Sequence, residues 1–168
     1  MSFYTELFEY LRTCPMLAEL WSVGASEEIG VNEILPQGTS ASVQYEDFID
    51  STGAYQCEMI PYPSVYEDYQ INCYRAYDAY DASSPADNIN VMSLDDVQAV
   101  CDWISAQNER GNLPKLSGKT VVSVECSPFI PQIRYINAAK NLAAYFITLR
   151  VRYVNPTARK AVEYALKN

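Results

Sequence analysis

Residues 93–118 read SLDDVQAVCDWISAQNERGNLPKLSG, and this stretch decides the fold because one amphipathic helix is followed there by an abrupt change of structure. Ser93 with Asp96 predicts a capping box at the start of the helix, and Arg110 with Gly111 predicts its end. Pro114 cannot continue a helix, so we expect a helix packed beside a sheet. The apolar stripe that would face the sheet is formed by Leu94, Val97, Val100, Cys101, Trp103 and Ile104.

Residues 142–154 are the clearest strand of the chain. Every odd-numbered residue from Ala143 to Tyr153 is apolar, whereas Arg150 and Arg152 lie on the other face. The two arginines are either solvated edge charges or partners for an acidic neighbour. A further strand is predicted over residues 121–126, after which Pro128 and Pro131 limit regular pairing.

Residues 2–14 form the second amphipathic pattern, with Leu7 and Leu11 on its apolar side. Pro15 is expected to end or kink this helix. Apolar residues continue as far as Trp21, and we expect them to form a final turn.

The segment between these helices is typical of short antiparallel strands. Turn residues near 36–38, 51–53 and 61–64 divide it, and the connections are too short for crossover helices. The expected strands cover 29–35, 42–45, 55–60 and 66–77. Arg75 interrupts the apolar face of the last one, which predicts that burial stops near that residue.

The predicted fold class is therefore α/β (α+β), with a mostly antiparallel sheet flanked by two main amphipathic helices. We expect a single domain over residues 1–154 and an extension over residues 155–168, in which Thr157–Lys167 forms a short helix. The helix has a thin apolar side, so it is either a frayed end or an element ordered by a partner.

Charge is divided unevenly along the chain. Residues 1–100 contain 17 acidic and 2 basic side chains, whereas residues 101–168 contain 4 acidic and 10 basic ones. Either the two parts fold against each other and the surface is mixed, or the protomer has an acidic and a basic face suited to head-to-tail contact. The acidic excess disfavours nucleic-acid binding.

The composition excludes several kinds of catalytic and metal-binding site. The chain has no histidine, so triads, metal sites and acid–base steps that need imidazole are absent. No phosphate-binding loop, dinucleotide-binding motif or nucleophile elbow occurs, and we expect no cofactor and no metal. The five cysteines are widely spaced and are predicted to be reduced core residues. No apolar run is long enough to span a membrane, and no secretory signal is expected.

Tyrosine is concentrated in the middle of the chain. Seven of the fourteen tyrosines lie between Tyr55 and Tyr80, more than one face of a small sheet needs. They either belong to an aromatic-rich sheet or contribute to an interface, because tyrosine combines apolar area with a polar tip. The predicted subunit interface comprises Tyr74, Tyr77, Arg150 and Arg152.

Three stretches resemble a family of small tail proteins from long-tailed bacteriophages and related prophage particles of Gram-positive bacteria. The proteins are often labelled minor capsid or minor tail proteins and are similar to tail terminators. The resemblance covers residues 1–21 and 93–154, whereas residues 22–92 match loosely. It is carried by FYTELFEYLRTCPML at residues 3–17, by WISAQNERGNLPKLSG at residues 103–118 and by YFITLRVRY at residues 145–153.

The resemblance implies a structural virion protein and not an enzyme. Such a protein is assembled in the host cytoplasm and forms a homohexameric ring on the last ring of the tail tube, where it stops tube growth. Its implied partners are other copies of itself, the tail tube protein and the head–tail connector; genomic DNA passes through the lumen without specific binding. A neck protein on the connector side is the alternative, and a small cytosolic enzyme or ligand-binding domain is a further one.

Overall fold

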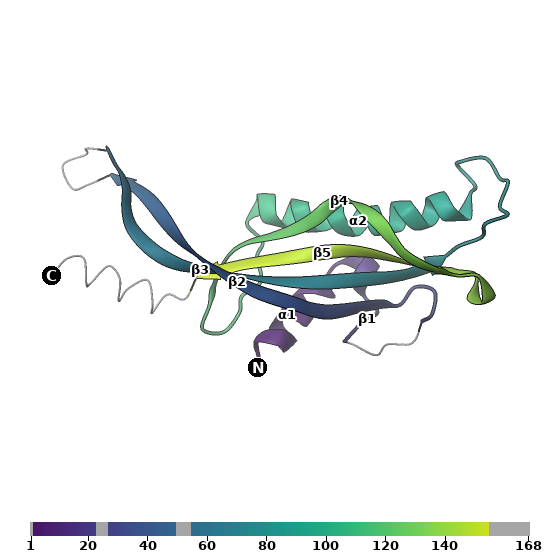
Figure 1. The fold of residues 1–168 in the computed structure, drawn as a ribbon, viewed down its shortest axis with the longest axis horizontal. Helices are drawn as coiled ribbons and strands as arrows, with labels where there is room; N and C mark the ends of the chain where they lie inside the picture. Colours follow the sequence, from purple (N-terminus) through teal and green to yellow (C-terminus); the bar gives the residue numbers. More distant parts are fainter. Residues whose placement is uncertain (1, 23–26, 50–54, 155–168) are drawn as a thin grey trace.

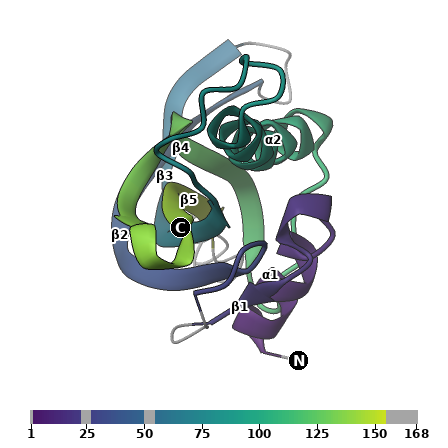
Figure 2. The ribbon, with the colours of Figure 1, turned by 90° about the vertical axis from the view of Figure 1, so that its right-hand side faces the viewer.

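The computed structural model describes residues 2–22, 27–49 and 55–154. In the fold, two helices cover one face of a curved sheet (Figure 1 and Figure 2). The sheet has five strands in the order β1-β2-β3-β5-β4, and every neighbouring pair except β1 with β2 is antiparallel. The predicted α+β class with a mostly antiparallel sheet is confirmed. The predicted C-terminal helix lies outside the described residues.

The N-terminal part contains helix α1 (Phe3–Leu11), the 3-10 turn η1 (Pro15–Leu17) and the short strand β1 (Leu20–Trp21). The Ser2 hydroxyl accepts a hydrogen bond from the Thr5 amide at 3.2 Å and caps α1. The predicted helix is confirmed but ends three residues early, because Pro15 removes a helical hydrogen-bond donor. The last two residues of the expected final turn, Leu20 and Trp21, instead form β1, which pairs with the first two residues of β2.

Helix α2 (Ile89–Arg110) is the predicted central helix, with an earlier start. Its cap is Asn88, whose side-chain oxygen accepts from the amides of Asn90 and Val91, so the predicted capping box at Ser93 is wrong. The Ser93 hydroxyl instead donates to the backbone oxygen of Ala76 at 2.6 Å and ties α2 to β3. The predicted end is confirmed, because Gly111 has a φ of 69°, a conformation that favours glycine.

Strands β2 (Asn32–Ile49) and β3 (Tyr55–Ala76) form one long hairpin in place of the four short strands predicted. The turn residues near position 37 produce a β-bulge, since the register shifts between Pro36 and Gly38. The prolines of the expected turn at 61–64 lie inside β3, where Pro61 and Pro63 face residues of β2. Proline is tolerated in a strand when its position donates no ladder hydrogen bond.

Strands β4 (Thr120–Asn137) and β5 (Leu142–Val154) are joined by the 3-10 turn η2 (Ala138–Lys140). The bounds of β5 match the prediction, and its odd-numbered residues are buried. In β4, Ser127 faces Thr148 of β5 while Gln132 faces Phe146, so residues 128–131 bulge out opposite a single residue. The prediction that Pro128 and Pro131 limit regular pairing is confirmed.

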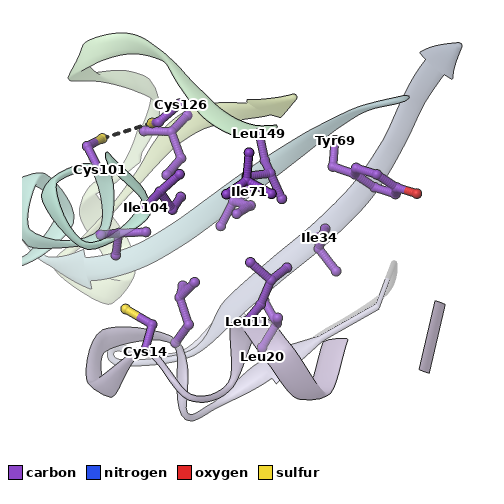
Figure 3. Packing of buried hydrophobic residues seen from close by; sticks show 14 of the residues in the cluster. Leu11, Cys14, Leu20, Ile34, Tyr69, Ile71, Cys101, Ile104, Cys126 and Leu149 are labelled. Atoms are coloured by element: carbon purple, nitrogen blue, oxygen red, sulfur yellow. Dashed lines mark hydrogen bonds between the residues drawn. The ribbon is translucent and has the colours of Figure 1, made fainter. Parts of the chain in front are cut away.

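The core lies between the helices and the sheet (Figure 3). Ile147 at the centre of β5 is completely buried, and Trp103 of α2 is half-buried against Tyr10, with ring centroids 5.6 Å apart. The predicted reduced cysteines are confirmed at four positions, and the side chain of Cys57 lies outside the described residues. These buried thiols are Cys14, Cys73, Cys101 and Cys126.

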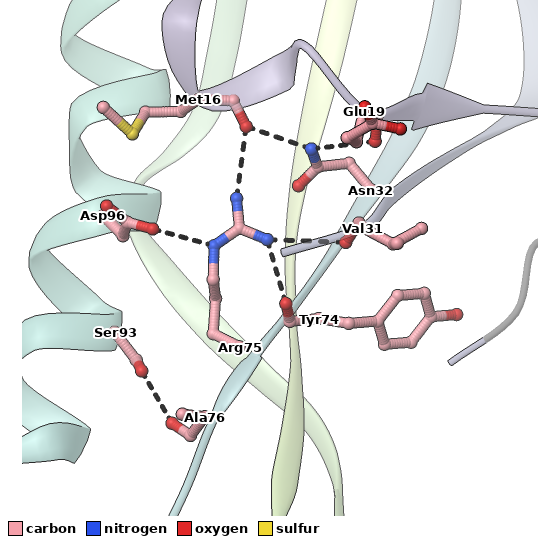
Figure 4. A network of polar contacts seen from close by, with 9 residues as sticks. All are labelled: Met16, Glu19, Val31, Asn32, Tyr74, Arg75, Ala76, Ser93 and Asp96. Carbon is pink, nitrogen blue, oxygen red and sulfur yellow. Dashed lines mark hydrogen bonds and ion pairs between the residues drawn. The ribbon is translucent and has the colours of Figure 1, made fainter. Parts of the chain in front are cut away.

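Arg75 of β3 is buried, with 4% of its surface exposed, which contradicts the prediction that burial stops there. Its Nε donates to Asp96 Oδ2 on α2 at 3.0 Å, and its Nη2 donates to the backbone oxygen of Met16 at 3.2 Å (Figure 4). Its Nη1 donates to the backbone oxygens of Tyr74 at 2.9 Å and Val31 at 3.4 Å. One side chain therefore joins η1, the approach to β2, β3 and α2.

The hairpin of β2 and β3 extends beyond the rest of the sheet. Strand β5 pairs with β3 only from Ser64 to Ala76, so residues 43–49 and 55–63 pair with each other alone among the described residues. We call this two-stranded extension the arm. At about 3.3 Å per residue its seven-residue strand is about 23 Å long. The arm lies at the opposite end of the molecule from the β4–β5 connection (Figure 1).

Candidate functional site: assembly surfaces

Arg150 lies exposed on β5, directly opposite Asp68 of β3. Its Nε donates to Asp68 Oδ1 at 2.8 Å and its Nη2 donates to Asp68 Oδ2 at 3.0 Å, which is a bidentate ion pair. These hydrogen bonds raise the pKa of Arg150. The acidic neighbour that the sequence analysis considered for this arginine therefore belongs to its own chain.

Arg152 lies near Arg150, as predicted, and both guanidinium groups lie over the ring of Tyr66. The guanidinium carbons of Arg150 and Arg152 are 5.1 and 5.7 Å from the ring centroid of Tyr66. A ring under two guanidinium groups holds them through cation–π attraction and restricts their rotamers. The arginines thus form a pre-ordered polar surface on the outer face of β3 and β5.

Tyr74 is buried, so the prediction that it forms part of a subunit surface is wrong. Its hydroxyl donates to Glu33 Oε2 at 2.9 Å, and the Asn72 side-chain amide donates to the same oxygen at 3.0 Å. Burial raises the pKa of Tyr74. The outer face is covered here because Tyr135 of the curving strand β4 packs against Tyr74, together with Val31, Leu142 and Ala144.

Tyr77 is half-buried, which leaves its predicted role at a subunit surface untested. Its ring is partly buried and packs against the main core, while its backbone amide donates to the backbone oxygen of Asn141 at 2.9 Å. Both groups therefore join the end of β3 to the body of the protein. Of the four predicted interface residues, the fold brings the two arginines together on the outer face, buries Tyr74 and leaves Tyr77 half-buried.

A second buried carboxylate, Glu67, lies between β3 and β5. It accepts hydrogen bonds from the hydroxyls of Tyr69 at 2.8 Å and Tyr153 at 3.2 Å, and Lys119 Nζ is 3.9 Å away. Burial and the nearby carboxylate raise the pKa of Tyr153 to about 12. Glu67, like Glu33, thus accepts hydrogen bonds from the hydroxyls of buried tyrosines.

Strand β4 presents an apolar surface that the sequence analysis missed. Ile130, Ile133 and Ile136 have exposed fractions of 72, 47 and 45%, and we call them the isoleucine patch. A further bulge explains their spacing, since Ile133 faces Tyr145 and Ile136 faces Ala143 while the register shifts between residues 133 and 135. The bulge places Ile133 and Ile136 on the same face although they are three residues apart.

The outer edge of β4 is divided into a covered and an open part. In its first half, Asn108 of α2 accepts a hydrogen bond from the Val124 amide at 3.1 Å, so the helix covers the backbone there. A groove of about 600 Å³ runs between α2 and this half and is lined by Glu109, Glu125 and Arg150, among others. The second half, which contains the isoleucine patch, is the edge of the sheet within the described residues.

Comparison with known proteins gives no family assignment, since no family model matches the sequence and no curated protein matches it. The described part of the chain contains no helix long and apolar enough to cross a membrane. In the same residues, no three of the side chains that commonly bind metals gather at one place. The surface features of the described residues include the arm, the two arginines, the groove beside α2 and the open half of β4.

Proposed function

We propose that this protein is a structural virion subunit, a tail terminator. It forms a ring at the head-proximal end of a phage tail tube, stops tube polymerisation and provides the joint to the connector. The observation that carries the proposal is the arm, a two-stranded extension for which the described part of the chain supplies no third strand. Such a ribbon is only marginally stable in water by itself, so it suits a protein that functions in an assembly.

Two buried carboxylates and a buried thiol are engaged in the fold. Glu33 and Glu67 accept hydrogen bonds from buried tyrosines. Burial raises the pKa of the Cys73 thiol to about 12, so this thiol is protonated at neutral pH. We therefore assign the protein a structural role, which agrees with the resemblance to tail terminators.

Native mass spectrometry of the purified protein, alone and mixed with the tail tube protein, tests the proposal. We expect closed homohexamers that bind the end of preformed tubes in a fixed ratio and prevent further growth. An unrelated protein of similar acidity is the control for nonspecific binding. A protein that stays monomeric under both conditions and leaves tube growth unchanged would contradict the proposed function.

The free protein is expected to bind duplex DNA weakly. If DNA crosses the lumen of the ring during ejection, a lining of carboxylates from the first hundred residues lets it pass without adhering. That part of the chain has 17 acidic and 2 basic side chains. A gel shift at physiological ionic strength measures this, and tight, salt-sensitive binding would contradict the acidic lining.

A further inference from the structure

We propose that the arm of one protomer docks on the isoleucine patch and open β4 edge of a second copy of this chain. The inference deepens the proposed ring function and rests on it, because it names the surfaces through which the ring closes. The two surfaces differ, and the arm lies at the opposite end of the molecule from the β4–β5 connection, toward which the second half of β4 runs (Figure 1). Contact between different surfaces is heterologous, so each protomer contributes an arm to one neighbour and a patch to the other.

Charge favours this pairing. Residues 43–63, which contain the arm, include four acidic and no basic side chains. Residues 130–140, which contain the isoleucine patch, include Arg134 and Lys140 and no acidic side chain, and both basic residues are exposed. Complementary charge orients the approach of two protomers, while two arms or two patches repel each other.

Apolar content favours the same pairing. The arm sequence is rich in large apolar residues, namely Val43, Tyr45, Phe48, Ile49, Tyr55, Met59, Ile60 and Tyr62. The patch offers three isoleucines with exposed fractions of 45% or more. An apolar centre surrounded by charged groups is the usual arrangement of a protein interface.

The backbone supplies a third argument. The edge of a sheet presents unpaired amide and carbonyl groups that can pair with a strand from another chain. In β4 the half near Val124 is covered by Asn108 of α2, whereas the half with the patch is the open edge in the described structure. The arm of a second copy, itself a two-stranded ribbon, would gain a third strand there.

Two variants test the isoleucine patch and the arm separately. The patch variant, Ile130→Glu with Ile133→Glu, keeps the arm and loses the apolar patch. The arm variant, Glu46→Lys with Asp47→Lys and Glu58→Lys, keeps the patch and reverses the charge of the arm. The matched control is Val122→Glu, which places a carboxylate at an exposed position in the covered half of β4. Thermal unfolding of each variant checks the fold.

Native mass spectrometry of each variant and of their equimolar mixture is the test. We expect each variant alone to self-associate at least about a hundredfold more weakly than the wild type, and Val122→Glu to assemble normally. In the mixture, the intact arm of one variant meets the intact patch of the other, so 1:1 heterodimers form and no closed ring appears. A shortened hairpin, with residues 44–62 replaced by Asn-Gly, serves as the arm variant if the lysine substitutions prevent folding.

The outcomes distinguish this inference from the proposed function. Assembly of the folded patch variant into normal rings, or a mixture that stays monomeric while the wild type forms rings, would overturn the arm–patch contact and leave the ring function standing. A wild-type protein that forms no oligomer, alone or with the tube protein, would overturn both.

Discussion

Replacing Arg75 with leucine is expected to lower the free energy of unfolding by about 2–4 kcal/mol, because a hydrogen bond from a charged donor contributes about 1.5–3 kcal/mol. Leucine fills part of the volume but donates no hydrogen bond. The backbone oxygens of Met16 and Tyr74 would then lose the guanidinium donors that lie 3.2 and 2.9 Å away. Asp96 would also lose its ion-pair partner, but its side chain is 46% exposed and can be hydrated. Urea denaturation followed by circular dichroism measures the change.

Arg150→Leu is the matched control for this prediction. It removes the same charge, but the Arg150 side chain is 46% exposed and donates to the carboxylate of Asp68 in place of backbone oxygens. The expected loss is about 1 kcal/mol or less. Equal losses at the two arginines would show that Arg75 does not join the segments around it as the structure indicates.

Ile147→Ala is expected to cost about 2–5 kcal/mol, the range for removing a large aliphatic side chain from a core. Ile147 has no exposed surface, and neither has Ile71, which faces it on β3. The strands of a hydrogen-bonded sheet cannot move together to fill the space, so a cavity remains. Ile29→Ala, at a position that is 57% exposed, is the control and should change the stability by about 0.5 kcal/mol or less. Similar losses at both positions would contradict the assigned core.

The strand that the sequence predicted best is β5. Its strict alternation from Ala143 to Tyr153 agrees with one buried face, and its bounds match the prediction. The long hairpin of β2 and β3 could not be predicted in the same way. Proline usually favours turns, but Pro36 lies at a β-bulge and Pro61 lies inside β3. The local sequence predicts turns at these residues, whereas the long-range pairing of β2 with β3 places them in strands.

Arg75 shows why a buried charge is hard to predict from a strand pattern. In the alternation of β3 it looks like the point where burial ends, because an isolated charge is expensive to bury. Its partners come from Met16, Val31 and Asp96, which are distant in sequence and meet only in the folded chain. Tyr74 was misplaced for a related reason, since the curvature of β4 covers a face that alternation alone assigns to water.

The isoleucine patch was missed because its spacing does not fit a strand. Ile130, Ile133 and Ile136 recur every three residues, which in isolation suggests a helix. The signal that could have found them is the pair Pro128 and Pro131, which excludes a regular helix there and leaves a bulged strand as the alternative.

Electron microscopy of phage or prophage particles assembled without this protein tests the tail-terminator proposal most directly. We expect tails of variable and abnormal length that are not joined to heads, because nothing stops the growth of the tube or forms the joint. Supplying the wild-type protein should restore tails of uniform length. Tails of normal length joined to heads in the complete absence of the protein would contradict the proposal.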